Sequence, residues 1–207
     1  MNAMYGKKIG MTRIFTPDGD SVGVTAIEVE PATVVRVKTK DIDGYKAAVV
    51  SFGSVRQKLV TKPFKGQFEK NGNEVKKYLR EIRIVGDQLP EKGSKIGVDI
   101  FKPGEKVHIS GISRGLGFQG TVRRHHFRGG PKTHGQSDRL RAPGSVGASS
   151  YPSRTFLGQR MAGHMGDDKV TVKNVTVVGV EPEQNLLLVS GPIPGHKNSI
   201  VYVRKAR

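Results

Sequence analysis

Residues 169–190 read KVTVKNVTVVGVEPEQNLLLVS, and this stretch decides the fold class of the chain. Six valines fall within residues 169–181, and residues 186–190 are rich in leucine. Branched apolar residues at this density favour strands, and the PEQN sequence between the two runs has the composition of a turn. We therefore predict a long strand over residues 169–181 and an antiparallel hairpin partner over residues 186–190.

The same signals continue on both sides of this hairpin. Strands are predicted at residues 22–30, 33–39, 45–52, 79–85, 96–101, 106–112 and 199–203. Turn sequences separate them, namely PDGD at 17–20, DIDG at 41–44, PEKG at 90–93 and KPGE at 102–105. One short helix is expected after Pro63, with Phe64 and Phe68 on one face and Asn71-Gly72 as its stop.

Closely spaced strands without alternating helices favour a mostly antiparallel barrel over a parallel sheet. We predict a mainly β fold in which residues 1–113 and 166–207 form the barrel. A small α/β excursion is expected at about residues 60–85. Residues 114–165, called the basic segment, would be inserted between the strand ending at Ile112 and the strand beginning at Lys169.

The basic segment differs in composition from the rest of the chain. It holds nine lysines and arginines, four of the six histidines and ten of the 27 glycines, but a single acid, Asp138. About half of the net charge of +17 therefore lies on a quarter of the chain. With five leucines and valines and no isoleucine, the segment cannot bury enough apolar surface to offset its ordering entropy. The uncompensated cationic side chains also repel one another. A polyanion would remove this repulsion, and nucleic acid is the commonest polyanion in a cytoplasm.

The whole-chain composition excludes several classes of protein. The absence of cysteine rules out disulfides and thiolate metal sites and is compatible with a reducing, cytoplasmic location. No apolar window is long enough for a membrane-spanning helix, and the N-terminal residues lack the apolar core of a secretion signal. A pI near 10.2 favours nucleic acid as the partner, because no long amphipathic helix is evident for a membrane surface.

Three motifs suggest chemistry, but their surroundings do not support it. GLGFQG at residues 115–120 fits a dinucleotide fingerprint, yet at most two helical turns can follow it. Ser113, Asp138 and His164 follow the order of a hydrolase triad, but the strand-turn-helix context is missing. His125 and His126 are adjacent, with His134 beyond, and no cysteine or close carboxylate completes a metal site. We expect no cofactor, no metal and no small-molecule substrate.

Arginines and glycines along the basic segment fit a nucleic-acid backbone better. Arginine binds phosphate through two parallel hydrogen bonds and stacks on bases, and glycine lets backbone N–H groups approach a sugar-phosphate chain. Four aromatic residues are interleaved, and we expect each to serve as a local packing anchor rather than as a base-stacking platform. They are Phe118, Phe127, Tyr151 and Phe156.

Several motifs, taken together and in order, resemble the bacterial type of the large-subunit ribosomal protein L-three family. They are GKKIGMTRIF at residues 6–15, GLGFQG at 115–120, GGP at 129–131, RAPGSVG at 141–147, MAGHMG at 161–166, NLLLV at 185–189 and GPIPG at 191–195. The resemblance spans nearly the whole chain. It implies a barrel like that of translation factors and an extended loop that enters the core of the large ribosomal RNA.

The resemblance also implies a role. Members of this family bind near the 3′ end of the large-subunit rRNA, act early in subunit assembly and direct the loop tip, here residues 139–154, toward the peptidyl transferase centre. They are structural constituents of the cytoplasmic ribosome, not enzymes, and the implied neighbours are ribosomal proteins L-fourteen and L-nineteen. Some bacterial members carry a methylated glutamine in the tip. Ser150 stands at that position here, so the modification is not expected.

The candidate rRNA-binding residues combine the basic segment with the matched motifs. They are Lys7, Lys8, Arg13, Arg114, Arg123, Arg124, His125, Arg128, Lys132, His134, Arg139, Arg141, Ser145, Arg154, Arg160 and His164. Two alternative functions remain at this point. One is an RNA-acting hydrolase that uses Ser113, Asp138 and His164, and the other is an RNA-binding assembly factor outside the ribosome.

Overall fold

The computed structural model describes residues 1–207 except 18, 70–71, 73, 85, 87–88 and 207. The chain forms two compact units. The barrel unit comprises Met1–Ile112 and Lys169–Arg207, and the inserted unit comprises Ser113–Asp168. Among the described helices, none combines the length and apolarity needed to cross a membrane.

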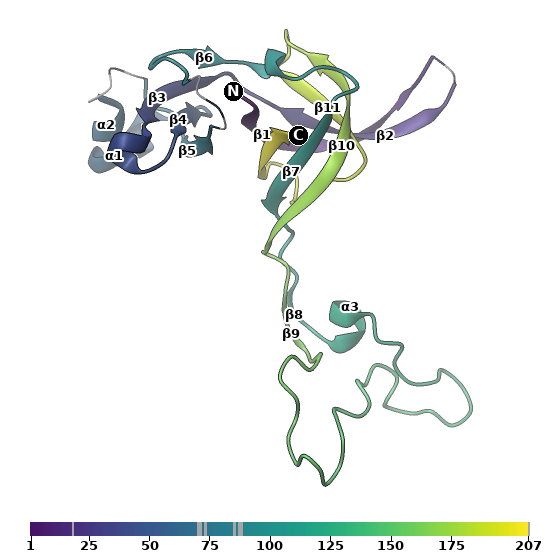
Figure 1. Ribbon diagram of the computed structural model, residues 1–207. Coiled ribbons are helices and arrows are strands. Elements are labelled where there is room, and N and C mark those ends of the chain that lie inside the picture. Colours follow the sequence, from purple (N-terminus) through teal and green to yellow (C-terminus); the bar gives the residue numbers. More distant parts are fainter. Residues whose placement is uncertain (18, 70–71, 73, 85, 87–88, 207) are drawn as a thin grey trace. The chain divides into compact units, whose positions relative to one another are not determined.

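A closed barrel of six strands forms the centre of the barrel unit (Figure 1). Every neighbouring pair around the barrel is antiparallel. In the order of pairing, the strands are β1 (Ala3–Phe15), β12 (Ile200–Lys205), β7 (Lys106–Ile112), β10 (Lys169–Glu181), β11 (Leu186–Ser190) and β2 (Ser21–Glu28). The predicted mainly β fold with an antiparallel barrel is therefore confirmed.

The hairpin of β10 and β11 has the bounds that the sequence predicts. Asn185 closes its turn with a positive φ of 53°, which asparagine tolerates better than most residues. Between Val172 and Val175 the pairing of β10 with β7 shifts by one residue, and Asn174 at this bulge has a φ of 57°. The bulge keeps Val175 and Val177 in the core although β10 is 13 residues long.

A second sheet in the barrel unit has four strands. In order of pairing these are β5 (Tyr78–Arg83), β4 (Ala47–Phe52), β3 (Ala32–Lys38) and β6 (Lys95–Ile96). The helices α1 (Lys40–Asp43) and α2 (Lys62–Glu69) and the 3₁₀ turn η1 (Gln57–Leu59) lie in the connections. The predicted helix is confirmed as α2, where Phe68 is fully buried and its ring meets that of Phe64 edge-on at 5.2 Å.

One predicted strand and one predicted turn differ from the structure. Residues 96–101 do not form a strand, because β6 ends at Ile96 and the 3₁₀ turn η2 (Val98–Ile100) follows. Val98 and Phe101 are both buried, and a 3₁₀ turn places residues three apart on one side. The predicted turn at residues 41–44 is the single helical turn α1, which Gly44 ends with a φ of 79°.

Some predictions extend to residues outside the described part of the chain. These are Asp18 in the predicted turn at 17–20, Asn71 in the predicted helix stop, and Val85 at the end of the predicted strand 79–85. The described residues of that last prediction are confirmed as strand from Leu79 to Arg83.

One hydrophobic core joins the barrel to the four-stranded sheet. It contains barrel residues such as Ile109 and Leu187 together with sheet residues such as Val34 and Ile82. On the sheet surface the Lys38 ammonium lies 2.6 Å from one Glu81 oxygen, and the Tyr45 hydroxyl donates to the other at 2.8 Å. Hydrogen bonds from Lys38 and then Tyr45 hold the pKa of the Glu81 carboxyl below its ordinary value.

The inserted unit has little regular structure. The strands β8 (Gly117–Gln119) and β9 (Gly163–Met165) pair as a two-stranded antiparallel ribbon. In the chain, the helix α3 (Thr121–His125) directly follows β8, and β9 comes at the end of the unit. After α3 the chain forms two wide loops before it returns to β9 (Figure 1). Thr121 is the single buried residue among the 56 residues of this unit, all of which are described. The unit therefore has no hydrophobic core of its own.

Candidate nucleic-acid interface

The cations of the inserted unit project into solvent. Arg124 is half-buried, and the others are exposed, namely Arg114, Arg123, Arg128, Lys132, Arg139, Arg141, Arg154 and Arg160. None of them forms an ion pair with a described residue, whereas the ion pairs of the structure lie in the barrel unit. The repulsion that the composition predicts is thus left uncompensated within the protein.

Two predicted site residues organise the base of the loops. The Arg124 guanidinium donates to the Met161 carbonyl at 2.8 Å, and a ring nitrogen of His125 lies 3.0 Å from the same oxygen. A Cβ at Gly163 would lie 2.6 Å from an Arg124 guanidinium nitrogen, so a side chain there would push the guanidinium away from its present place. Arg124 and His125 therefore hold α3 against the chain that leads into β9, and this local role accounts for the half-burial of both side chains.

Close backbone approaches bring distant arginines together in the first loop. The Gly130 N–H donates to the Leu140 carbonyl at 2.9 Å. Any side chain at Gly129 would meet the same carbonyl, and Gly129 has a φ of 76°. This crossing places Arg128 beside Arg139, although eleven positions separate them in the sequence.

Arg128 and Arg139 line a hollow together with Phe127 and Gln136. The Gln136 amide nitrogen is buried there and has no hydrogen-bond partner among the described residues. Buried donors are normally satisfied, so this nitrogen, in a hollow that Arg128 and Arg139 also line, suits an acceptor such as a phosphate oxygen. The sequence did not single out Gln136. Glutamine is common in loops, and only the fold brings it beside the arginines.

The tip region, residues 139–154, is open. The Ser145 hydroxyl donates to the Gly147 carbonyl at 2.9 Å, so this predicted site residue closes a local turn.

Three further predicted site residues lie outside the tip region. Lys132 and His134 are exposed, and His134 has a positive φ of 57°. The His164 ring approaches the Gly166 carbonyl at 3.0 Å.

The prediction that the aromatic residues serve as packing anchors is wrong for three of the four. Phe118 is 77% exposed, Tyr151 89% and Phe156 56%, because the unit has no core in which to place them. Only Phe127 is half-buried, with its ring centroid 6.1 Å from that of His125. Exposed rings beside cations, such as Phe156 at 6.0 Å from the Arg154 guanidinium, are available to stack on bases.

The three candidates in the barrel unit differ from one another. Lys8 donates to the carbonyls of Ile193 at 2.9 Å and Gly195 at 3.1 Å, so its ammonium ties β1 to the bend at 191–195. Lys7 lies 3.7 Å from Glu28. Arg13 is exposed, with its guanidinium 5.9 Å from the Phe15 ring centroid. Of the three, Arg13 is the most available to a phosphate.

The residues of the alternative triad are not brought together by any described interaction. The Ser113 hydroxyl accepts from the Asp168 N–H at 3.2 Å, Asp138 accepts from Ser137 at 3.4 Å, and His164 has the partner given above. After GLGFQG, α3 has five residues, which confirms the predicted short helix. In the described part of the chain no group of three histidine or acidic side chains could hold a metal ion.

A folded β-barrel that carries an inserted, cationic and coreless unit defines a class of protein that binds polyanions. The sequence profile of the family described as Ribosomal protein L3 matches residues 84–186. The chain is 47% identical to the large ribosomal subunit protein uL3 of Herpetosiphon aurantiacus over 206 residues, covering 100% of this chain and 97% of that protein. It is 50% identical to the uL3 of Chloroherpeton thalassium and 49% identical to that of Chlorobaculum tepidum, with 98% of each chain covered. This chain therefore belongs to the ribosomal protein L3 family.

Proposed function

We propose that this protein is a structural constituent of the large ribosomal subunit and binds large-subunit rRNA through its inserted unit. Membership of the family supports this role, and it also supports the conclusion that the protein is a structural component rather than an enzyme. It also supports neighbouring ribosomal proteins as partners and the cytoplasmic ribosome as the location.

The observation that carries the proposal is the state of the cations in the inserted unit. Nine lysines and arginines lie on a unit with no core, and none has an acidic partner among the described residues. Phosphates would supply both the missing charge and the missing contacts, because each Arg–phosphate pair is a charge-assisted hydrogen bond. The RNA thereby replaces the core that the unit lacks.

Finer features of the role follow from the family resemblance. We propose that the RNA site lies near the 3′ end of the large rRNA, that the protein acts in subunit assembly, and that residues 139–154 support the region around the peptidyl transferase centre. Ribosomal proteins L-fourteen and L-nineteen are the proposed neighbours. The exposed candidates, such as Arg139, Arg141 and Arg154, are proposed to contact phosphates, and Arg124 and His125 to position the loops.

Salt dependence of RNA binding tests the electrostatic part of the proposal. If roughly six to eight cations meet phosphates, the logarithm of the affinity for a large-subunit rRNA fragment should fall against the logarithm of salt with a slope of about −4 to −7. A slope near zero would contradict the proposal. Stoichiometric sedimentation with large subunits after a high-salt wash distinguishes a ribosomal constituent from an assembly factor outside the ribosome.

Amide exchange tests the division between the two units. None of the described amides of residues 143–155 forms one of the backbone hydrogen bonds of the structure, whereas neighbouring barrel strands are paired through backbone ladders that are interrupted at bulges in β1 and β10. The free protein should therefore exchange rapidly at residues 143–155 and slowly in the barrel, and rRNA should slow the former. Strong protection of these loop amides without RNA would contradict an RNA-dependent order.

A further inference from the structure

A pocket in the barrel unit lies between the barrel and the four-stranded sheet. Three stacked rings form one wall: the ring centroids of Tyr5 and Phe52 are 5.4 Å apart, and those of Phe52 and Tyr78 are 5.3 Å apart. Ile200 closes the apolar side. The space is about 260 Å³ counted to its open mouth. Because this volume includes open solvent at the mouth, the enclosed part is well below the size of ordinary small-molecule sites, and the pocket suits a single side chain that enters from the surface.

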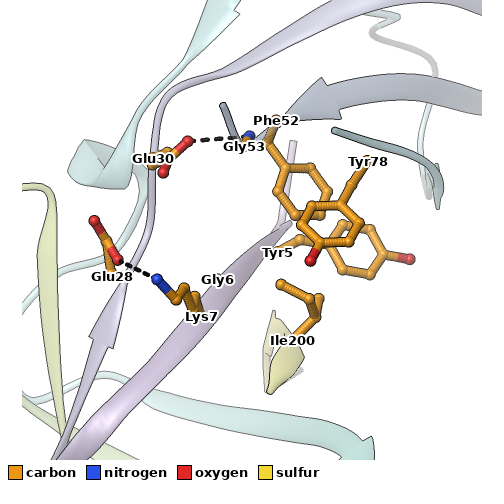
Figure 2. A pocket seen from close by; sticks show the side chains of 9 residues that line it. All are labelled: Tyr5, Gly6, Lys7, Glu28, Glu30, Phe52, Gly53, Tyr78 and Ile200. Carbon is orange, nitrogen blue, oxygen red and sulfur yellow. Dashed lines mark hydrogen bonds and ion pairs between the residues drawn. The ribbon is translucent and has the colours of Figure 1, made fainter. Parts of the chain in front are cut away.

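Two carboxylates face the rings across this pocket. Figure 2 shows Glu28 and Glu30 on the side opposite the aromatic wall. The Gly53 N–H donates to one Glu30 oxygen at 3.0 Å, which fixes the carboxylate, and Glu30 has no ion-pair partner among the described residues. Lys7 approaches Glu28 at 3.7 Å, beyond hydrogen-bond range. The pocket therefore has an unbalanced negative charge on a chain whose net charge is +17.

We infer that this pocket receives an arginine side chain from a neighbouring protein of the large subunit, an inference that rests on the proposed function. The aliphatic stem and planar guanidinium of arginine pack well on aromatic rings, and the cation binds carboxylates. The aromatic stack already attracts a cation of this chain, since the Lys77 ammonium lies 5.2 Å from the Tyr78 ring centroid. An RNA occupant is disfavoured, because Glu28 and Glu30 repel phosphate.

The occupant can be identified by photo-crosslinking within assembled large subunits. Tyr78 is replaced by p-benzoyl-phenylalanine, and Phe118 of the inserted unit receives the same replacement as the control. Position 78 should crosslink to a protein segment that contains arginine, and position 118 to rRNA. If the Tyr78 variant fails to fold, position 200, where Ile200 also lines the pocket, carries the probe instead.

A charge variant tests whether the carboxylate holds the occupant. Glu30→Gln keeps an acceptor for the Gly53 N–H and removes the charge, so the crosslink yield from position 78 should fall about five- to tenfold. The matched control Glu183→Gln, in the exposed turn between β10 and β11, should leave the yield unchanged.

The outcomes separate this inference from the proposed function. Crosslinks to rRNA from both positions, no crosslink from position 78 in subunits that contain the protein, or a yield insensitive to Glu30→Gln would overturn the arginine pocket alone. A protein that does not enter large subunits would overturn both proposals.

Discussion

Replacing Arg139 and Arg141 together with alanine should weaken RNA binding without affecting the stability of the barrel unit. Both side chains are exposed, and neither has an ion-pair partner among the described residues. Their loss therefore leaves the core of the barrel unit intact, and the free energy of unfolding should change by no more than about 0.5 kcal/mol.

The size of the RNA effect follows from counterion release. Each lost phosphate contact makes the salt slope less steep by about 0.7 to 0.9. Two lost contacts should therefore reduce the slope by about 1.4 to 1.8 and weaken the affinity about 25- to 60-fold at about 0.1 M salt. Those values assume that each arginine meets one phosphate.

The assay is equilibrium binding of the full chain to a large-subunit rRNA fragment between about 50 and about 300 mM salt. A control variant with Lys58→Ala and Lys92→Ala removes the same charge from exposed positions of the barrel unit. Urea unfolding of each variant measures the stability of the barrel.

Three results would refute the reasoning. An unchanged salt slope would mean that the two arginines do not meet phosphates. An equal loss in the control variant would mean that only net charge matters. A loss of several kcal/mol in the stability of the barrel unit would mean that the loop arginines support its core.

The remaining predictions concern the fold. Leu187→Ala should lower the free energy of unfolding by about 2 to 5 kcal/mol in urea titrations, because Leu187 is fully buried; a loss below about 1 kcal/mol would contradict its place in the core. The pKa of Glu81 is lowered by hydrogen bonds from Lys38 and Tyr45, so the unfolded chain takes up this proton at higher pH than the folded one. The stabilising contribution of Glu81 should be complete above the ordinary pKa of 4.5 and lost as the pH falls through the lower folded pKa. Glu81→Gln should therefore make the free energy of unfolding depend less on pH in that acidic range, as measured by urea unfolding at several pH values. Gly166→Ala should accelerate exchange of the Leu116 amide, since Gly166 has a φ of 82° and its added Cβ would clash with the backbone carbonyl of Arg114; unchanged exchange would show that the ribbon adapts.

Strands dense in branched apolar residues were predictable from the sequence. The strands β7, β10 and β11 have the bounds that their valines, isoleucines and leucines indicate. Residues 96–101 were mispredicted because GVDIF contains the apolar residues of a strand, while Val98 and Phe101 are buried through a 3₁₀ turn. Composition does not distinguish spacing by two from spacing by three over so short a run.

The candidate interface was predictable as a segment and less so as individual contacts. The near absence of acids already distinguishes residues 114–165 from the rest of the chain, since charge is additive along a chain. The side chains of Lys8, Arg124 and His125 bond to backbone carbonyls of segments distant in the sequence. These structural roles could not be predicted, because they depend on which segments contact one another in the fold. Gln136 was missed for the same reason.

The sequence by itself determined that the chain is mainly β, that its excess charge lies on one coreless segment, and that its motifs resemble one ribosomal family. These properties depend on residue type and local period, which need no knowledge of distant contacts. Only the tertiary structure decided that β3 and β4 leave the barrel for a second sheet, that Gly129 and Gly130 bring Arg128 beside Arg139, and that two glutamates face three stacked rings. Each depends on pairing between segments far apart in the chain, where strand register and close backbone approach select the neighbours.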